Sequence, residues 1–313
     1  MVNIARADDF IGNPSDLTVN STLTHEAHKA FDNKLLEIFR DRMVGIGDLK
    51  SHGLVERFDF GTVLAYYQRI GDTTAASISM DGLAKGQDDS LTYDMVGVPI
   101  PVITKDWTLP ARQLASSRLS GHPLDTTQMA MSARIVMDYI ENMLFNGVPN
   151  FVVDNSRIYG YTTHPDRKTV TLSGTGWGSA AGRDILGDTK NMIELLNGDN
   201  IYGPLTMYVA KDIWVELQMD YSANKGDKTF KQRIEDFADI QEVKVADSLN
   251  DGNVILVKLS SEVVSLYVCR DIINMQWSAD DPLSTNFKVM GAMAPCIKST
   301  KIRQCGVCHA IPS

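Results

Sequence analysis

The chain of 313 residues has few cysteines, and their positions do not suggest disulfide bonds. The 4 cysteines are Cys269, Cys296, Cys305 and Cys308, whereas a disulfide-stabilised domain spaces its cysteines in pairs along the chain. The run Cys305-Gly-Val-Cys308-His309 matches the c-type haem attachment pattern. Because the flanking residues alternate as in a strand, the two cysteines point to opposite faces. We therefore expect ordinary buried or half-buried thiols here, and no haem or metal.

Long apolar runs are also missing. Residues 1–20 lack the basic start and apolar stretch of a secretory signal. The best candidate for a membrane span, residues 254–268, is interrupted by Lys258 and Glu262 and is shorter than the roughly 18–20 residues that a span needs. We therefore expect a protein with no membrane partner that is intracellular when it is made.

Basic residues are the minority among the charged ones. Lys and Arg number 30 against 39 Asp and Glu, which gives a formal net charge of −9. This balance argues against a protein that grips nucleic acid through a broad basic face. The hydrophobic fraction of 43% and the charged fraction of 22% are those of an ordinary folded protein, and exclude a long disordered tail or a free coiled coil.

Sequence motifs for catalysis are absent as well. There is no phosphate-binding GxxxxGK[ST] loop and no GxSxG nucleophile elbow. The glycine-rich run 174–179 has Ser179 where a dinucleotide fingerprint needs glycine or alanine. His25 and His28 lie one helix turn apart but lack a third metal ligand. We expect no catalytic residue, cofactor or metal; a soluble α/β enzyme is the least favoured function, supported mainly by the helix–strand alternation of 184–277.

Helical periodicity is strongest in two segments. Apolar residues recur at helical spacing over 22–43 and again over 125–145, where Asn146-Gly147 ends the second helix. Residues 148–182 have the composition of a loop. The remaining expected elements are helices at 184–197, 213–219 and 228–237, strands at 91–112, 205–210, 240–246, 254–259, 263–268 and 272–277, and two strand-like runs within 286–310 joined near Pro295.

Residues 54–90 form an excursion with too few apolar residues to make a core of its own. Strand-like runs enclose a stretch rich in Gly, Asp, Ser and Thr, which predicts a long two-stranded ribbon. Such a ribbon is marginally stable alone, so we expect it to rest on another surface. Tyr and Arg near its middle are residue types enriched at protein interfaces. Our candidate assembly-interface residues are Tyr66, Tyr67, Arg69, Asp88 and Asp89.

Four stretches carry a family resemblance through their order and spacing. Residues 99–114 (PIPVITKDWTLPARQL) place an apolar strand and a "TL" turn ahead of the long helix, and 133–147 (ARIVMDYIENMLFNG) end that helix with two acids before Phe-x-Gly. Residues 202–220 begin with Gly-Pro, a strand and an acid-capped helix containing Trp. Residues 230–272 continue with a helix, a strand, a gap and a hydrophobic hairpin. This order resembles the Hong Kong 97-type fold, an α+β fold shared by tailed-phage major capsid proteins and encapsulins.

The resemblance implies a division of the chain into an arm, an extended loop and two domains. The implied parts are an N-arm at 1–21, an N-terminal helix region at 22–53, an extended loop (E-loop) at 54–90, a peripheral domain at 91–179 and 278–313 with a spine helix at about 125–146, and an axial domain at 180–277.

The same resemblance implies a shell protein of one of two kinds. The first is the major capsid protein of a tailed double-stranded DNA phage, which self-assembles into pentamers and hexamers of an icosahedral head around the genome. The alternative is an encapsulin nanocompartment that packages cargo enzymes, and the amphipathic helix 22–43 is encapsulin-like. The length of the chain, the extended excursion at 54–90 and the preceding arm favour the capsid.

A capsid function implies particular partners and a location. The main partner is the chain itself, in pentamers and hexamers. We also expect a separate scaffolding protein, since no long charged scaffolding segment precedes the fold, together with a portal and decoration proteins. The acidic charge implies weak contact with the packaged double-stranded DNA. The expected location is the virion capsid, assembled in the host cytoplasm.

Overall fold

The computed structural model describes residues 43–71, 80, 93–110, 112, 127–173, 177, 182–220, 228–278 and 284–312. The expected arm at 1–21, residues 22–42 of the expected helix 22–43, and Asp88 and Asp89 lie outside these residues. The chain divides into two compact units. Unit 1 contains residues 1–63, 100–144 and 266–294, and unit 2 contains residues 64–99, 145–265 and 295–313.

Unit 1 is built on a four-stranded sheet. Its strand order is β1 (Val55–Arg57), β11 (Val264–Ser278), β12 (Ser284–Ile297) and β4 (Val102–Pro110). β12 and β4 are antiparallel, and the opposed Trp107 and Phe287 stack with their ring centroids 4.1 Å apart. Such cross-strand aromatic pairs stabilise a sheet and pin its register.

The two expected strands at 263–268 and 272–277 are one continuous strand, β11. The polar residues between the two runs suggested a break. Asp271 instead stays in the strand because Lys50 and Arg57 neutralise it, at 2.9 Å and 3.0 Å from its carboxylate oxygens. These bonds hold the pKa of the Asp271 carboxyl below its usual range, even though burial opposes this.

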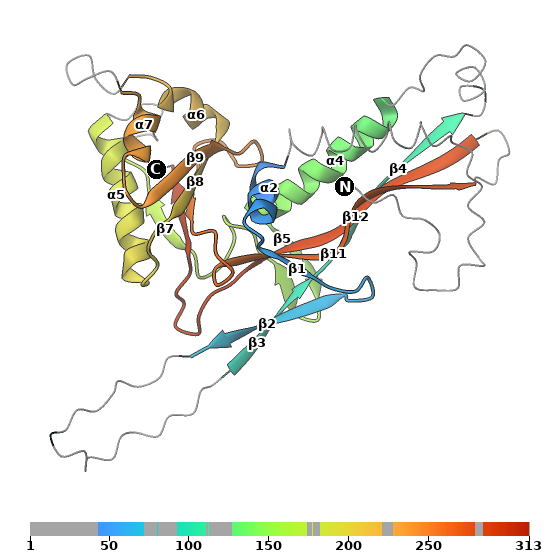
Figure 1. Ribbon diagram of the computed structural model, residues 1–313, viewed down its shortest axis with the longest axis horizontal. Coiled ribbons are helices and arrows are strands. Elements are labelled where there is room, and N and C mark those ends of the chain that lie inside the picture. The colour runs from blue at the N-terminus through green and yellow to red at the C-terminus, as the bar shows by residue number, and fades with distance from the viewer. Residues whose placement is uncertain are drawn as a thin grey trace. The chain divides into compact units, whose positions relative to one another are not determined.

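The long helix expected at about 125–146 is confirmed as α4 (Thr127–Asn146), which runs alongside β4 and β12 (Figure 1). Ile140 is fully buried, and its side chain reaches the backbone of β12 at Gly291. Gly147 ends the helix with a φ of 67°, a left-handed conformation that glycine adopts without strain. No helix among the described residues is long and apolar enough to cross a membrane.

A short helix in unit 1, α2 (Val44–Ser51), is capped by a residue of α4. Its N-cap, Met43, has no side-chain cap bond. The two carboxylate oxygens of Glu141 accept hydrogen bonds from the backbone N–H groups of Gly45 at 2.6 Å and Ile46 at 3.1 Å. These N–H groups would otherwise lack partners at the first turn of the helix. Burial nevertheless outweighs the bonds and raises the pKa of Glu141 to about 7.

The raised pKa of Glu141 predicts a pH-dependent stability. Between pH 4.5 and 7 the folded chain keeps a proton that the unfolded chain has released, so stability falls as pH rises. We expect the parent to lose about 3 kcal/mol relative to Glu141→Gln between pH 4.5 and about pH 8. Urea unfolding of both proteins across this range measures the difference, and parallel stability curves would contradict the prediction.

Unit 2 contains a five-stranded sheet. Its order is β7 (Lys168–Thr171), β13 (Val307–Ile311), β10 (Val254–Val257), β8 (Leu205–Val209) and β9 (Ile240–Val245). Every residue of the central strands β8 and β10 is buried, as expected for strands covered on both faces. Three helices accompany the sheet (Figure 1): α5 (Gly182–Gly198), α6 (Lys211–Leu217) and α7 (Phe230–Glu235). They confirm the helix–strand alternation expected from the sequence.

The expected loop at 148–182 is only partly a loop. It contains β5 (Val148–Val153), β6 (Ser156–Ile158) and β7. β5 and β6 form a hairpin, and its two turn residues, Asp154 and Asn155, have φ angles of 47° and 58°. The strands were missed because they are short and mostly half-exposed, so their apolar alternation is weak.

The C-terminal strands break at a different place from the expected one. β12 continues through Pro295 to Ile297, and the interruption lies between Ile297 and Val307. The pairing of β12 with β4 already ends at Ala292, so the missing N–H of Pro295 costs no bond in that ladder. β13 then pairs with β10 and β7, which places 307–311 in the five-stranded sheet of unit 2. The domain boundaries stay predictions.

Candidate functional site

Unit 2 contains a two-stranded antiparallel ribbon, but its second strand lies outside the expected range 54–90. β2 (Leu64–Ile70) pairs over its full length with β3 (Tyr93–Pro99). The strand expected at 91–112 is therefore two strands, β3 and β4, which belong to different sheets. One face is covered, since Ala65, Tyr67 and Val98 are buried. The opposite face carries large exposed apolar side chains. These are Tyr66, which is 50% exposed, Tyr93 and Met95.

The base of the ribbon packs closely on the β5–β6 hairpin. A side chain at Gly97 would place its Cβ 2.5 Å from the hydroxyl oxygen of Ser156 and 3.2 Å from the ring of Tyr66. Glycine at position 97 therefore lets β3 approach β6 closely, and the Tyr66 ring packs beside the backbone of Gly97. The exposed face of the ribbon thus starts from a tightly packed base.

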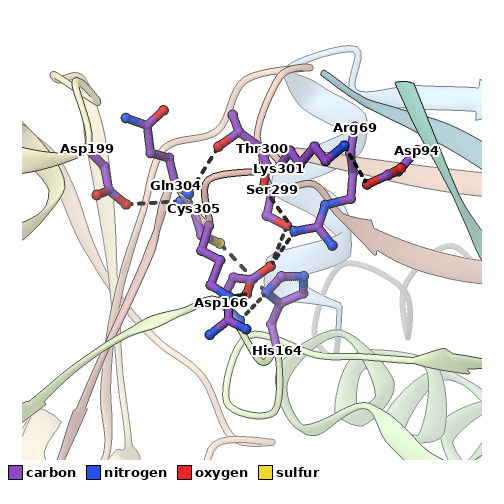
Figure 2. A network of polar contacts seen from close by, with 11 residues as sticks. Arg69, Asp94, His164, Asp166, Asp199, Ser299, Thr300, Lys301, Gln304 and Cys305 are labelled. Carbon is purple, nitrogen blue, oxygen red and sulfur yellow. Dashed lines mark hydrogen bonds and ion pairs between the residues drawn. The ribbon is translucent and has the colours of Figure 1, made fainter. Parts of the chain in front are cut away.

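The covered face ends in a polar network centred on Asp166 (Figure 2). One oxygen of its carboxylate, Oδ2, accepts hydrogen bonds from Arg69 Nη2 at 3.0 Å and from Ser299 Oγ at 2.7 Å. The other, Oδ1, lies 3.8 Å from Nε of Arg303. Arg69 Nη2 also donates to the carbonyl oxygen of Thr300 at 2.9 Å. The Asp166 side chain is only 9% exposed, so water screens this charge pair weakly.

A tight turn supplies most of the partners in this network. The backbone N–H of Thr300 donates to Gln304 O at 3.0 Å, and that of Arg303 donates back to Thr300 O at 3.0 Å. Arg303 has a φ of 64°, which lets the chain reverse here. The N–H of Cys305 then donates to the carboxylate of Asp199 at 3.1 Å (Figure 2). The turn is thus fixed to the residue that follows α5.

Two buried histidines lie close to the network, and both are neutral. Nδ1 of His164 accepts a hydrogen bond from the backbone N–H of Asp166 at 3.2 Å. Nδ1 of His309 accepts from Nε of Arg167 at 3.2 Å, so its Nε2–H donates to Asn253 Oδ1 at 3.0 Å. Burial lowers the pKa of both imidazoles to about 4, and the nearby Arg167 adds to the shift.

The cysteine–histidine contact here lacks the electrostatics of a catalytic pair. Cys305 Sγ lies 3.9 Å from His164 Nδ1, but burial, assisted by nearby carboxylates, raises the pKa of this thiol to about 12. Burial also raises the pKa of Cys308 to about 12. Only a thiolate is a strong nucleophile or metal ligand, and the raised pKa values favour the protonated thiol at both positions. The described residues contain no cluster of three or more His, Cys, Asp or Glu suited to a metal ion.

A cleft of about 450 Å³ opens beside the ribbon base. Its walls are the ribbon, the β5–β6 turn, the loop that carries His164, and the end of β12. Tyr66, Asn155 and Arg157 contribute polar groups to the walls. A catalytic cleft would be expected to gather reactive groups with accessible charge, whereas the charged Arg69 and Asp166 here are already paired with each other.

The structure places the five predicted interface residues differently. Tyr66 is exposed on the open face of the ribbon, Tyr67 is buried beneath it, and Arg69 is bound to Asp166. Burial raises the pKa of the Tyr67 hydroxyl to about 12. Asp88 and Asp89 lie outside the described residues. The interface role of all five therefore stays a prediction.

Sequence reasoning missed Asp166 and the turn that binds it. Asp166 is 97 residues from Arg69 and 133 from Ser299, so no local pattern links them. The one available signal was the Arg69 side chain itself. A charged residue on the same strand face as the buried Ala65 and Tyr67 needs a partner on that covered face.

Comparisons with known proteins agree on the fold. No curated protein matches the sequence. A virus-like particle from Pyrococcus furiosus matches with 16% identity and a TM-score of 0.64 over 91% of this chain and 99% of that chain. The capsid of Myoviridae Phage XM1 matches with 9% identity and a TM-score of 0.64 over 84% of this chain and 91% of that one.

A chain of Mycobacterium phage Bobi matches with 12% identity and a TM-score of 0.61, over 84% of this chain and 89% of that one. The α+β architecture and these likenesses confirm the expected Hong Kong 97-type fold. Residues 17–310 match the family described as "Family of unknown function (DUF6260)". The chain therefore belongs to that family, and its fold is that of the Hong Kong 97-type shell proteins.

Proposed function

We propose that this chain is the major capsid protein of a tailed double-stranded DNA phage, which assembles into pentamers and hexamers of an icosahedral head. The observation that carries the proposal is the nearly complete coverage of the chain from the capsid of Myoviridae Phage XM1, of which 91% is matched. The likeness thus extends over nearly all of that capsid chain.

The open face of the ribbon supports assembly. Tyr66, Tyr93 and Met95 leave large apolar surfaces in water on an element with no core of its own. Burial of such surface against a second copy is favourable, at about 25 cal/mol per Å². In our proposal Tyr66 contacts the neighbouring subunit, Tyr67 and Arg69 orient the ribbon, and Asp88 and Asp89 belong to the same contact.

The proposal extends to partners and location. We propose that the chain works with a separate scaffolding protein, a portal and decoration proteins, and that it contacts the packaged DNA only weakly. Its proposed location is the virion capsid, which is assembled in the host cytoplasm. The net charge of −9 supports weak contact, because an acidic wall repels a polyanion.

An encapsulin shell is the second candidate. The virus-like particle from Pyrococcus furiosus favours it, because the match covers 99% of that chain. Expression of the full chain alone, followed by size-exclusion chromatography and electron microscopy, separates the two functions. Tubes, sheets or irregular shells that become regular with a scaffold support the capsid. Small closed shells with co-purified cargo support the encapsulin. A stable monomer or dimer over a range of salt concentrations would contradict both.

Tyr66→Glu is expected to prevent assembly without unfolding the subunit. A charge would be desolvated wherever Tyr66 meets a neighbour, so the protein concentration needed for assembly should rise at least about tenfold. The thermal midpoint should stay the same, because the side chain is exposed in the subunit. Tyr66→Phe keeps the ring and serves as the matched control. Unchanged assembly of Tyr66→Glu by light scattering would exclude this contact.

A further inference from the structure

One cross-strand pair at the base of the ribbon makes contacts with the rest of unit 2 from both strands. Arg69 of β2 and Asp94 of β3 are direct partners across the ribbon. Arg69 reaches Asp166 and the carbonyl oxygen of Thr300, and Asp94 lies 3.7 Å from the ammonium group of Lys301 (Figure 2). The turn 299–303 therefore engages both strands of the ribbon at the same cross-strand pair.

The two contacts differ in strength. The Lys301 and Asp94 side chains are 42% and 53% exposed, and such pairs contribute little to stability. Arg69 and Asp166 are 24% and 9% exposed, and Ser299 adds a hydrogen bond to the same carboxylate oxygen. Charge-assisted hydrogen bonds in such a buried setting are stronger than neutral ones. Asp166 is thus the main attachment of the ribbon to this turn.

The other end of the turn is fixed to the body of unit 2. Ser299 and Cys305 form an antiparallel bridge that closes the turn. Asp199 accepts a hydrogen bond from the N–H of Cys305 and also binds Lys168 of β7 at 2.9 Å. The ribbon is consequently connected through the turn to α5 and the five-stranded sheet, whose buried apolar residues belong to one hydrophobic core.

We propose that Asp166 and the turn 299–303 form a clamp that fixes the direction of the ribbon in the unassembled subunit. The clamp holds the covered face down and presents Tyr66, Tyr93 and Met95 to the next subunit. This inference rests on the proposed shell function. A contact surface that is ordered before association loses less conformational entropy on binding, so the clamp speeds assembly and strengthens it.

The test removes both buried charges together. In Arg69→Met/Asp166→Asn no unpaired charge is left, so the subunit should still fold. The matched control, Lys190→Met/Glu194→Gln, removes an exposed ion pair on α5 of the same unit. Hydrogen exchange of the unassembled subunits is measured for the amides of β2 and β3 and for those of β8 and β10. Light scattering then follows assembly of the same proteins.

In the clamp variant we expect exchange in β2 and β3 to rise at least about tenfold while β8 and β10 stay protected, and assembly to slow. The control should behave like the parent in both measurements. Unchanged ribbon exchange in the clamp variant would overturn the proposal. If that variant unfolds as a whole, Ser299→Ala is measured in its place, with the same expected rise in ribbon exchange, because it removes the side-chain hydrogen bonds of Ser299 to Asp166 and to Tyr67 of β2. If the parent itself forms no shells, the proposed function fails, while ribbon exchange still tests the clamp.

Discussion

Replacing Gly160 with alanine is expected to lower the free energy of unfolding by about 3 kcal/mol or more. A Cβ at this position would overlap the backbone nitrogen of Gly147 and lie 2.6 Å from the carbonyl oxygen of Phe145. Backbone atoms cannot rotate away as a side chain can. Phe145 is further held by edge-to-face contacts with Tyr161 and Tyr208, at ring-centroid distances of 5.7 Å and 5.3 Å. The surrounding structure therefore cannot relax locally to relieve the overlap.

Gly187→Ala is the matched control for this substitution. Gly187 lies inside α5, and a Cβ there would meet no atom within 4 Å. Alanine should stabilise the protein by about 0.5–1 kcal/mol, because it has the higher helix propensity. Chemical denaturation of the parent and both variants gives the comparison. Equal stability of the two variants would show that the contact between Gly147 and Gly160 is not tight.

Acidification from pH 7 to pH 5 is expected to destabilise the protein through His164 and His309. Each imidazole has a pKa of about 4 in the folded protein, against 6.5 unfolded, so only the unfolded state takes up protons in this range. The lowered pKa means that the contribution to stability is complete above pH 6.5 and is lost as pH falls. At pH 5 the two losses together amount to about 4 kcal/mol.

The non-titrating variant His164→Asn/His309→Gln isolates this effect. Asn and Gln offer polar atoms near the positions of the imidazole nitrogens that make the observed bonds. The stability of the parent relative to the variant should fall by about 4 kcal/mol as pH falls from 7 to 5. Because Glu141 titrates equally in both proteins, its opposite contribution cancels in the difference. Stability curves that run parallel would be evidence against neutral buried histidines.

Elements that depend on local sequence patterns were predicted more accurately than features that depend on contacts between residues far apart in the chain. α4 and the α5–β8–α6 succession were predictable because each has its own periodic pattern. The first ribbon strand, β2, was predictable as well, but its partner β3 was expected within 54–90 and lies at 93–99. β11 was split in two because the charge of Asp271 seemed to break it, and its partners Lys50 and Arg57 come from elsewhere in the chain. Local patterns contain no information on such partners.

The ribbon residues of the candidate site were predictable from the sequence, but their partners in the rest of unit 2 were not. Tyr66, Tyr67 and Arg69 were identified by residue type on a ribbon. In the structure Tyr66 lies on the exposed face, whereas Tyr67 and Arg69 lie on the covered face. Asp166 could not be identified, because an aspartate after proline in a loop has many ordinary uses. The neighbours of 307–311 could not be predicted for a related reason. Its apolar alternation predicts a strand but does not select the strands it pairs with, which are β10 and β7.

Chemical labelling of the four free thiols can be used to measure partial unfolding of the protein. Cys269 lies in unit 1 and is half-buried, whereas Cys296, Cys305 and Cys308 lie in unit 2 and are buried. An alkylating reagent reaches a buried thiol only when the surrounding structure opens. The order in which peptides become labelled therefore separates the opening of one unit from that of the other. Cys305, at the end of the 299–303 turn, follows the clamp region without any added probe.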